Sequence, residues 1–431
     1  MKKLAAVVAL LCVFGLGMSF ALLGALSVNL REHLSIGDAQ YGTLIMVFML
    51  SCLVMSLVVG LLVDKWGHKP LAILGFIVLA LCIFAVGISS SYSLVVVALL
   101  LLGIGAMCLN TAGNTLIPVV LFGGKNPAAA SNFGNVFFGL GAFLTPLLSA
   151  WLFKRSPEAY AGNITVLAVI ALLPVIIAIL AEYPIVRTGF TASQGVSLLG
   201  QPVVIIAGLT LFLYIALEAS FTNWITPYGK EVSLKAMGEA GQQALAATTP
   251  EAIEALSAGA KQAANEAGAT GKLMMSAFFI AMMVGRLTAS QVKAITRIGD
   301  KVIAGVGLVV AIVILIMMKS SSEPLAWVLV ILAGLACAPG FPTTAGVTFS
   351  KFQPRVYGSV FGIIFAIGLA GAVIVPKVIG NWAQDRTVQA SLGILIPVGV
   401  LLIVFALILG TVKARGDVAA APAEDTPQPA E

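Results

Sequence analysis

The feature that most constrains this chain is a series of apolar segments, each about 20 residues or longer, separated by short polar breaks. An α-helix needs about 20 mostly apolar residues to cross the hydrocarbon core of a bilayer. The pattern therefore predicts an all-α membrane protein with twelve transmembrane helices in two six-helix halves. The expected spans lie near 4–29, 40–63, 70–89, 92–121, 129–153 and 162–181, and then near 201–227, 273–293, 300–318, 324–349, 356–382 and 389–412.

The composition excludes a soluble protein, because 60% of the residues are hydrophobic and only 10% are charged, against about 25% charged in an ordinary soluble domain. The net charge of +6 comes largely from Lys and Arg in loops on one side, which marks that side as cytoplasmic and does not imply a nucleic-acid partner. The apolar start is too long for a cleaved signal and is expected to remain as the first helix. We expect a multi-pass protein of a bacterial inner (plasma) membrane with both termini in the cytoplasm, surrounded by the lipid bilayer.

The domain organisation follows from the spacing of the segments. Residues 1–181 form the N-terminal half, 182–200 a cytoplasmic linker and 201–412 the C-terminal half. The insertion 229–272 is expected on the periplasmic side, as one or two short surface helices or, alternatively, as a lid over an outward-facing cavity. The Pro-rich and acidic tail 413–431 is expected to be disordered.

Metal, cofactor and enzyme chemistry are not expected. The two histidines, His33 and His68, are placed in loops, and no catalytic Ser/His/Asp cluster is apparent. The cysteines all lie in apolar segments, are odd in number and lack CxxC spacing, so they are interpreted as buried apolar residues. They are Cys12, Cys52, Cys82, Cys108 and Cys337.

The loop after the second span carries a motif, "GLLVDKWGHKPLAILG", which begins at Gly60. It resembles the signature loop of the major facilitator superfamily, a Gly-x-x-x-Asp-Arg/Lys-x-Gly pattern followed by basic residues. A glycine lets a neighbouring helix approach closely, and an aspartate can cap the positive N-terminus of a facing helix. The resemblance implies a latch that holds the cytoplasmic side shut, made by Gly60, Asp64, Lys65, Gly67 and Lys69.

The corresponding place in the second half, "GRLTASQVKAITRIGDK", keeps Gly285 and Arg286 but has no acid at the motif position, so a second latch is doubtful. Arg286 lies near the cytoplasmic end of its expected helix. We expect it to extend toward the membrane surface, and a role in solute binding is the alternative.

Polar side chains at membrane depth outline the expected binding site, because they are costly unless they face a partner or a water-filled cavity. Asn110 and Asn114 lie four residues apart in the fourth span, and Asn132 and Asn135 lie three apart in the fifth. Amides both donate and accept hydrogen bonds, which suits a neutral, hydroxyl-rich solute. The alternative is that they join helices to one another. In the tenth span, Pro339 and Pro342 should break the helix and free carbonyl groups.

Glu218, in "LYIALEASFTNW", is the only acid expected at membrane depth, and Tyr214 shares its helical face. Asn223 and Trp224 complete the candidate substrate-binding set. Three roles remain open for Glu218. It could accept hydrogen bonds from a sugar that Trp224 or Phe221 stacks upon, carry the coupling proton, or pair with Lys377 or Arg286.

These polar stretches also resemble the fucose:proton symporter branch of the superfamily, at "LNTAGN", "NFGNVFFGLGA", "LYIALEASFTNW" and "APGFPT". Asn110 stands where that branch often has Glu, and Phe138 where it often has Asn. The resemblance implies a monomeric secondary active transporter that moves a sugar or similar small polyhydroxy solute by alternating access, with proton symport as the expected coupling. A drug or metabolite exporter of the same fold and an uncoupled sugar facilitator are the alternatives.

Overall fold

The fold is a bundle of long helices, twelve of which, within the described part of the chain, are long and apolar enough to cross a membrane. The computed structural model describes residues 2–36, 38–156, 158–184, 197–247, 254–383 and 386–420, together with 195 and 252. Within these residues the only β-type pairing is an isolated bridge between Phe352 and Ala419. The all-α architecture and the number of spans expected from the sequence are therefore confirmed.

The N-terminal half contains six spans, of which the sixth is broken before Pro174 into two helices. Its helices are α1 (Lys2–Leu34), α2 (Asp38–Trp66), α3 (His68–Ile88), α4 (Tyr92–Val120), α5 (Pro127–Arg155), α6 (Tyr160–Leu172) and α7 (Pro174–Leu180). His33 therefore lies inside α1, and His68 is a buried residue at the start of α3. The expectation that both histidines lie in loops was wrong.

In its described residues, the C-terminal half contains the other six spans and one short helix between them. Its helices are α9 (Pro202–Ala236), α10 (Gly238–Ala246), α12 (Ala258–Ser290), α13 (Gly299–Lys319), α14 (Glu323–Cys337), α15 (Gly340–Phe349), α16 (Tyr357–Trp382), α17 (Val388–Ser391) and α18 (Leu395–Thr411). The pairs α14 with α15 and α17 with α18 each form one span.

Local sequence explains where several of these helices begin. The Asn126 side chain accepts a hydrogen bond from the Ala129 N–H at the start of α5, where Pro127 occupies the first turn and needs no N–H partner. Ser257 caps α12 in the same way through the N–H of Ala260. These side chains satisfy backbone donors that the first turn of a helix leaves unpaired.

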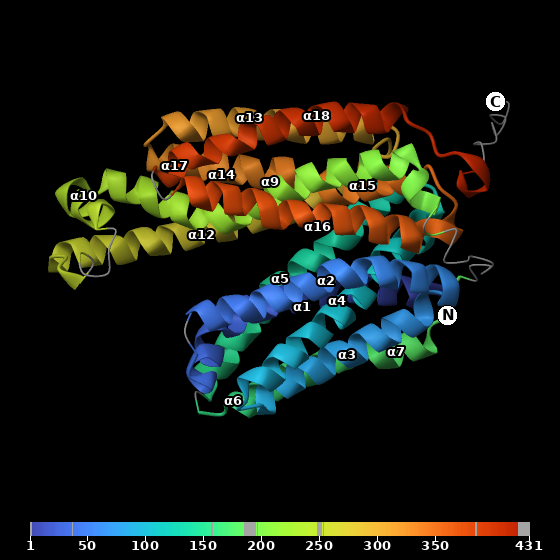
Figure 1. Cartoon of the computed structure of the whole chain (residues 1–431), viewed down its shortest axis with the longest axis horizontal. Coiled ribbons are helices and arrows are strands. Elements are labelled where there is room, and N and C mark those ends of the chain that lie inside the picture. The colour runs from blue at the N-terminus through green and yellow to red at the C-terminus, as the bar shows by residue number, and fades with distance from the viewer. Residues whose placement is uncertain are drawn as a thin grey trace.

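The two halves lie close together at one end of the bundle and diverge toward the other (Figure 1). The end where they meet is the one at which α1 begins and α18 ends, and we call it the termini end. The opposite end carries α10, and we call it the hairpin end. The main contacts between the halves are those of α2 and α4 with α16 and those of α5 with α12 and α15.

The segment 229–272 is largely a continuation of two transmembrane helices. Helix α9 continues to Ala236 and α12 already begins at Ala258, and together they form a helical hairpin (Figure 1). The short helix α10 between them is largely exposed, as expected for a surface helix. The segment is rich in Ala, Gln and Glu, which have high helix propensity. Gly238, at φ 61°, provides the sharp turn after α9.

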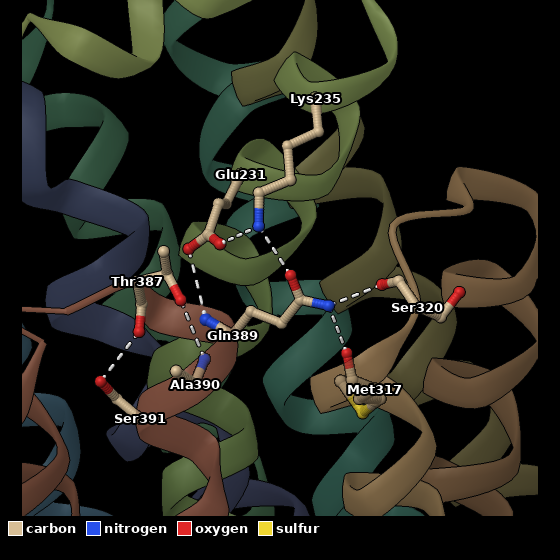
Figure 2. Close-up of polar contacts among 8 residues, drawn as sticks. All are labelled: Glu231, Lys235, Met317, Ser320, Thr387, Gln389, Ala390 and Ser391. Atoms are coloured by element: carbon tan, nitrogen blue, oxygen red, sulfur yellow. Dashed lines mark hydrogen bonds and ion pairs between the residues drawn. The ribbon is translucent and has the colours of Figure 1, made fainter.

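A buried polar network fastens the extended part of α9 to the rest of the C-terminal half (Figure 2). Glu231 accepts hydrogen bonds from Lys235 Nζ (2.6 Å) and from the Gln389 N–H (3.2 Å). The Gln389 side chain accepts from Lys235 Nζ (2.7 Å) and donates to the carbonyls of Met317 and Ser320 (2.6 Å each). Glu231 is a buried acid within a helix, whereas the sequence placed it in a loop.

Two expectations concern residues that are only partly described. Most of the linker 182–200 lies outside the described residues, as does the end of the tail from 421. The described beginning of the tail is packed against the α15–α16 connection, because the Gln353 N–H donates to Val418 O (3.0 Å) and the Ala420 N–H donates to Lys351 O (3.0 Å). Residues 416–420 thus lie against this connection, and disorder of the tail 413–431 stays a prediction.

Candidate functional site

An ion pair between α9 and α12 lies at the centre of the candidate site. Arg286 Nη2 is 3.1 Å from Glu218 Oε1, and the side chains are 3% and 21% exposed respectively. The expectation that Arg286 extends to the membrane surface was wrong, because its guanidinium turns into the bundle. Of the partners considered for Glu218 in a structural role, Arg286 is therefore the one observed, while Lys377 is exposed on α16.

Arg286 turns inward because backbone carbonyls there satisfy its donors. Its Nε donates to Ala338 O at 3.2 Å. The helical partner of that carbonyl would be residue 342, which is a proline and has no N–H. A Cβ on Gly285 would lie 3.1 Å from Leu335 O, so the glycine allows α12 to pass close to the break between α14 and α15.

Tyr214 uses a second carbonyl of the same break. Its hydroxyl donates to Cys337 O at 2.8 Å, and the side chain is fully buried. The expected freeing of carbonyls in the tenth span is confirmed, and two residues on neighbouring helices occupy them. This arrangement fixes the ring of Tyr214 one helical turn from Glu218 on α9.

A chain of amides leads from α4 to α5 and ends at the guanidinium. Asn114 Nδ2 donates to Asn110 Oδ1 (2.9 Å), and Asn135 Nδ2 donates to Asn114 Oδ1 (3.0 Å). Arg286 Nη1 in turn donates to the backbone carbonyl of Asn135 at 3.3 Å. Three of the four expected amides are thus brought together beside the ion pair, across the boundary between the halves.

Asn132 is separated from this chain. Its Nδ2 donates to Thr343 Oγ1 of α15 at 2.9 Å and to Ala128 O at 2.9 Å. The side chain therefore joins the two halves on the termini side of Arg286. For Asn132 the structure supports the helix-joining alternative.

The remaining candidates on α9 do not approach Glu218. The helix continues without unwinding through Pro227, so Asn223 is exposed on another face. Trp224 is half-buried, and its Nε1 donates to Pro376 O of α16 at 3.3 Å. Neither contributes to the ion pair or to the amide chain.

Two of the residues expected in a latch, Gly60 and Asp64, form a contact between α2 and α16. Asp64 Oδ1 accepts from the Gly358 N–H (2.8 Å) and Oδ2 accepts from the Ser359 N–H (2.6 Å), so the carboxylate caps the first turn of α16. A Cβ on Gly60 would lie 2.5 Å from Gly358 O, which explains the glycine.

The other motif residues surround this contact. Lys65 and Lys69 are exposed, and Gly67 adopts φ 80°, a conformation that favours glycine. His68 points inward, where its Nε2 lies 3.1 Å from Thr115 Oγ1 of α4.

Further contacts between the halves follow α5 from the termini end toward the middle of the bundle. Residues 126 to 139 cover roughly 20 Å of helix at about 1.5 Å per residue. We call these contacts the α5 seam. Four of them are hydrogen bonds: Thr296 Oγ1 to Asn126 Oδ1 (2.5 Å), Ala128 N to Thr296 Oγ1 (3.1 Å), and the Asn132–Thr343 and Asn135–Arg286 bonds. The fifth is the close packing of Gly139 against Met283, whose Cγ would lie 2.5 Å from a Cβ added to the glycine.

The chain matches a family model in sequence and known transporters in fold. The family model described as Major Facilitator Superfamily matches residues 9–260 and 241–431. The chain belongs to the Major Facilitator Superfamily. This membership confirms the superfamily resemblance seen in the loop at Gly60. Comparison with curated proteins gives no match.

Solved structures of this superfamily share the fold at low sequence identity. The E. coli fucose:proton symporter FucP superposes with a TM-score of 0.69 at 18% identity, covering 93% of this chain and 98% of that one. The proton:xylose symporter XylE, bound to 6-bromo-6-deoxy-D-glucose, gives 0.65 at 14% identity, with 94% of each chain covered. The human organic anion transporter MFSD10 gives 0.63 at 14% identity, covering 94% of this chain and 99% of that one.

Sequence reasoning considered Arg286 as a partner of Glu218 but favoured an orientation toward the membrane surface. Two signals were available: a basic residue inside an apolar span, which is rare without a partner, and a proline four residues after Ala338, which leaves a carbonyl without a helical partner. Neither signal alone says that α12 and the α14–α15 break face each other. That relationship depends on tertiary packing.

Proposed function

We propose that this Major Facilitator Superfamily protein moves a sugar or similar small polyhydroxy solute across a bacterial inner (plasma) membrane by alternating access, as a proton symporter and not as an enzyme. One observation carries the proposal. A continuous set of polar contacts, from Asn110 through Asn135 to Arg286 and Glu218, crosses the boundary between the halves at membrane depth. Polar groups at this depth are expensive and are retained where a solute or an ion passes.

The similarity to sugar:proton symporters supports this assignment. FucP and XylE are described as fucose:proton and proton:xylose symporters. At 18% and 14% identity the likeness concerns the fold, so the solute and the coupling ion are proposed from the site itself.

The arrangement of the halves supports an outward-facing state. Lys and Arg concentrate in the loops at the termini end, which we therefore assign to the cytoplasm. There the halves are joined by the Asp64 cap on α16 and by the α5 seam, whereas they diverge toward the hairpin end (Figure 1). These contacts would break when the transporter opens inward.

Glu218 and Arg286 provide the proposed link between proton and conformation. Protonation of Glu218 would remove its charge and weaken its bond to Arg286. The same guanidinium bonds to Asn135 O in the opposite half, so a change at the ion pair alters a contact of the α5 seam. Arg286 thus links the protonation of Glu218 to the opening of the cytoplasmic side.

An uncoupled facilitator is the second candidate, and the ion pair itself favours it. A Glu218 that stays ionised and paired with Arg286 throughout the cycle would hold two helices together without carrying a proton. The partial exposure of Glu218, against the almost complete burial of Arg286, supports the coupled alternative.

Ligand-dependent stability of the purified full-length protein tests the class of solute, because a ligand that binds only the folded state raises its melting temperature. The panel comprises L-fucose, D-xylose, D-glucose, D-galactose, D-glucuronate, D-galacturonate and two hydrophobic amines. We expect at least one polyhydroxy compound to raise Tm and the amines to have no effect. Stabilisation by the amines alone would overturn the proposal in favour of a drug exporter.

A further inference from the structure

We propose that the transported solute carries a carboxylate: a polyhydroxy acid, such as a hexuronate, enters as a monovalent anion together with one proton. This inference deepens the proposed function and rests on it. In the outward-facing state the solute's carboxylate replaces Glu218 on Arg286, and Glu218 holds the proton.

The charge of the site is fixed by a single cation. Among the Lys and Arg side chains that the structure describes, only Arg286 is buried. It forms one ion pair, with Glu218, whereas its two other bonds go to uncharged backbone carbonyls. With Glu218 ionised, the pair is neutral.

No other charged side chain near Glu218 alters this balance in the described part of the chain. Three of the helices that pack on α9 carry no ionisable side chain, namely α15, α17 and α18. Helix α14 contributes the thiol of Cys337, and α16 contributes the exposed Lys377 and the buried Tyr357. Helix α9 itself carries Tyr214 and, further toward the hairpin end, Tyr228, Lys230, Glu231 and Lys235. The remaining charged residues of α10, α12 and α14 lie toward the hairpin end, namely Glu239, Lys261, Glu266, Lys272 and Glu323.

This neutrality restricts what can accompany a proton. When Glu218 is protonated, Arg286 is left as a buried cation without a counter-charge, which is strongly unfavourable. A neutral sugar brings no charge to compensate. A carboxylate does, because one guanidinium, one neutral acid and one monovalent anion again sum to zero.

The geometry of Arg286 suits such an exchange. The Nε and Nη1 groups are held by Ala338 O and Asn135 O, so two backbone carbonyls fix the plane of the guanidinium independently of Glu218. Nη2 is the group that pairs with Glu218, and that carboxylate is the more exposed partner. A planar, pre-oriented guanidinium recognises carboxylates with high specificity.

The proposed step is a proton transfer coupled to an exchange of partners. A proton from the open side binds to a carboxylate oxygen of Glu218, the ion pair between Glu218 Oε1 and Arg286 Nη2 breaks, and an oxygen of the solute's carboxylate accepts from Nη2. The amide chain that ends at Asn135 lies beside the guanidinium and offers partners for the solute's hydroxyls. No net charge crosses the membrane in a complete cycle.

Electrical behaviour therefore separates the two kinds of solute. Symport of one proton with a monovalent anion is electroneutral, so a pH gradient drives it and a membrane potential does not. Symport of one proton with a neutral sugar carries one positive charge, so an inside-negative potential drives it. The two expectations are opposite for the same protein in the same vesicles.

The test uses full-length protein in proteoliposomes and two matched pairs of radiolabelled solutes, D-glucose with D-glucuronate and D-galactose with D-galacturonate. Each pair differs only in the carboxylate at C6. With an acidic exterior and the potential clamped to zero, we expect at least tenfold faster uptake of a uronate than of its neutral partner, and no response of uronate uptake to a potassium diffusion potential.

Two results would overturn the inference in distinguishable ways. Uptake of a neutral sugar driven by an inside-negative potential contradicts the anionic solute and leaves the proposed function intact. Uptake of none of the four solutes, by protein shown to be folded from its thermal transition, counts against both.

Substitutions test whether Arg286 binds the carboxylate of the solute. Arg286→Lys keeps the charge and loses the planar fork, so we expect at least a tenfold loss of uronate affinity. Lys377→Gln removes an exposed cation from α16 and serves as the matched control, with unchanged uptake expected. Equal losses of uronate transport in both variants would contradict the assignment, because the effect would then not depend on the guanidinium of Arg286.

Discussion

The guanidinium of Arg286, in the C-terminal half, donates a hydrogen bond to the backbone carbonyl of Asn135, in the N-terminal half, at 3.3 Å. The same guanidinium is paired with Glu218 at 3.1 Å. One side chain thus takes part both in the polar site and in the contact between the halves.

The ion pair should show coupling in a double-mutant cycle. Arg286→Gln alone leaves a partly buried carboxylate unpaired, and Glu218→Gln alone leaves a buried guanidinium unpaired, whereas the double variant leaves no charge. We expect the sum of the single losses to exceed the loss in the double variant by about 1–3 kcal/mol, within the range for contacting residues, measured by thermal unfolding in detergent. Strict additivity would show that the two charges do not interact.

Loss of the Asp64 charge should weaken closure of the termini end. Asp64→Asn keeps a hydrogen-bond acceptor but removes the negative charge at the first turn of α16, which is worth about 0.3–2 kcal/mol. Spin labels at Lys65→Cys on α2 and Lys301→Cys on α13 report the distance across this end, and we expect a longer, broader distribution. The matched control is Asp417→Asn, which changes an exposed carboxylate paired with Arg355 and should leave the distribution unchanged.

The close approach of α2 and α16 should depend on Gly60. In Gly60→Ala the new Cβ would lie 2.5 Å from Gly358 O, which is backbone and cannot rotate away. We expect a loss of about 1–3 kcal/mol, typical of overpacking, measured as a lower Tm. Gly42→Ala, on the same helix with no atom within 4 Å of the added Cβ, should not lower Tm. A similar decrease of Tm in both variants would mean that α2 tolerates alanine poorly in general, and that the contact of Gly60 with α16 is not the cause.

The polar network in Figure 2 should stabilise the protein without contributing to the solute site. Gln389→Ala leaves the carbonyls of Met317 and Ser320 without their side-chain partner and removes one of the two bonds of Lys235. Each buried unsatisfied group costs roughly 1–3 kcal/mol. We expect a clearly lower Tm, with solute-induced stabilisation retained. The control is Gln262→Ala, because Gln262 is exposed and bonds only to its helix neighbour Glu266. An unchanged Tm for Gln389→Ala would mean that water replaces the network at no cost.

The sequence was informative where the signal is local. Apolar runs of sufficient length predicted the spans, because crossing a bilayer imposes a length on each helix. The contact of Asp64 with a facing helix also follows a local signal, since Gly60 and Asp64 lie one helical turn apart on α2. The ends of α9 and α12 were missed because the hairpin residues, although polar, have high helix propensity and continue both helices.

The site could be predicted only in part, because its contacts depend on how separate helices face one another. Asn132 and Asn135 are three residues apart, yet one bonds to Thr343 across the halves and the other to Asn114 within its own half. The position of Arg286 in its helix allowed either an inward or an outward orientation. The carbonyls of Ala338 and Asn135 decide between them, and neither is adjacent to Arg286 in sequence.

The most direct test of the proposed coupling compares uphill accumulation with counterflow exchange in proteoliposomes containing Glu218→Gln, using the solute that stabilises the purified protein most. Glutamine retains the shape of the side chain but cannot exchange a proton. We predict that accumulation driven by a pH gradient is lost while counterflow persists. Accumulation at the wild-type level would contradict the account, because Glu218 could then not be the group that carries the proton.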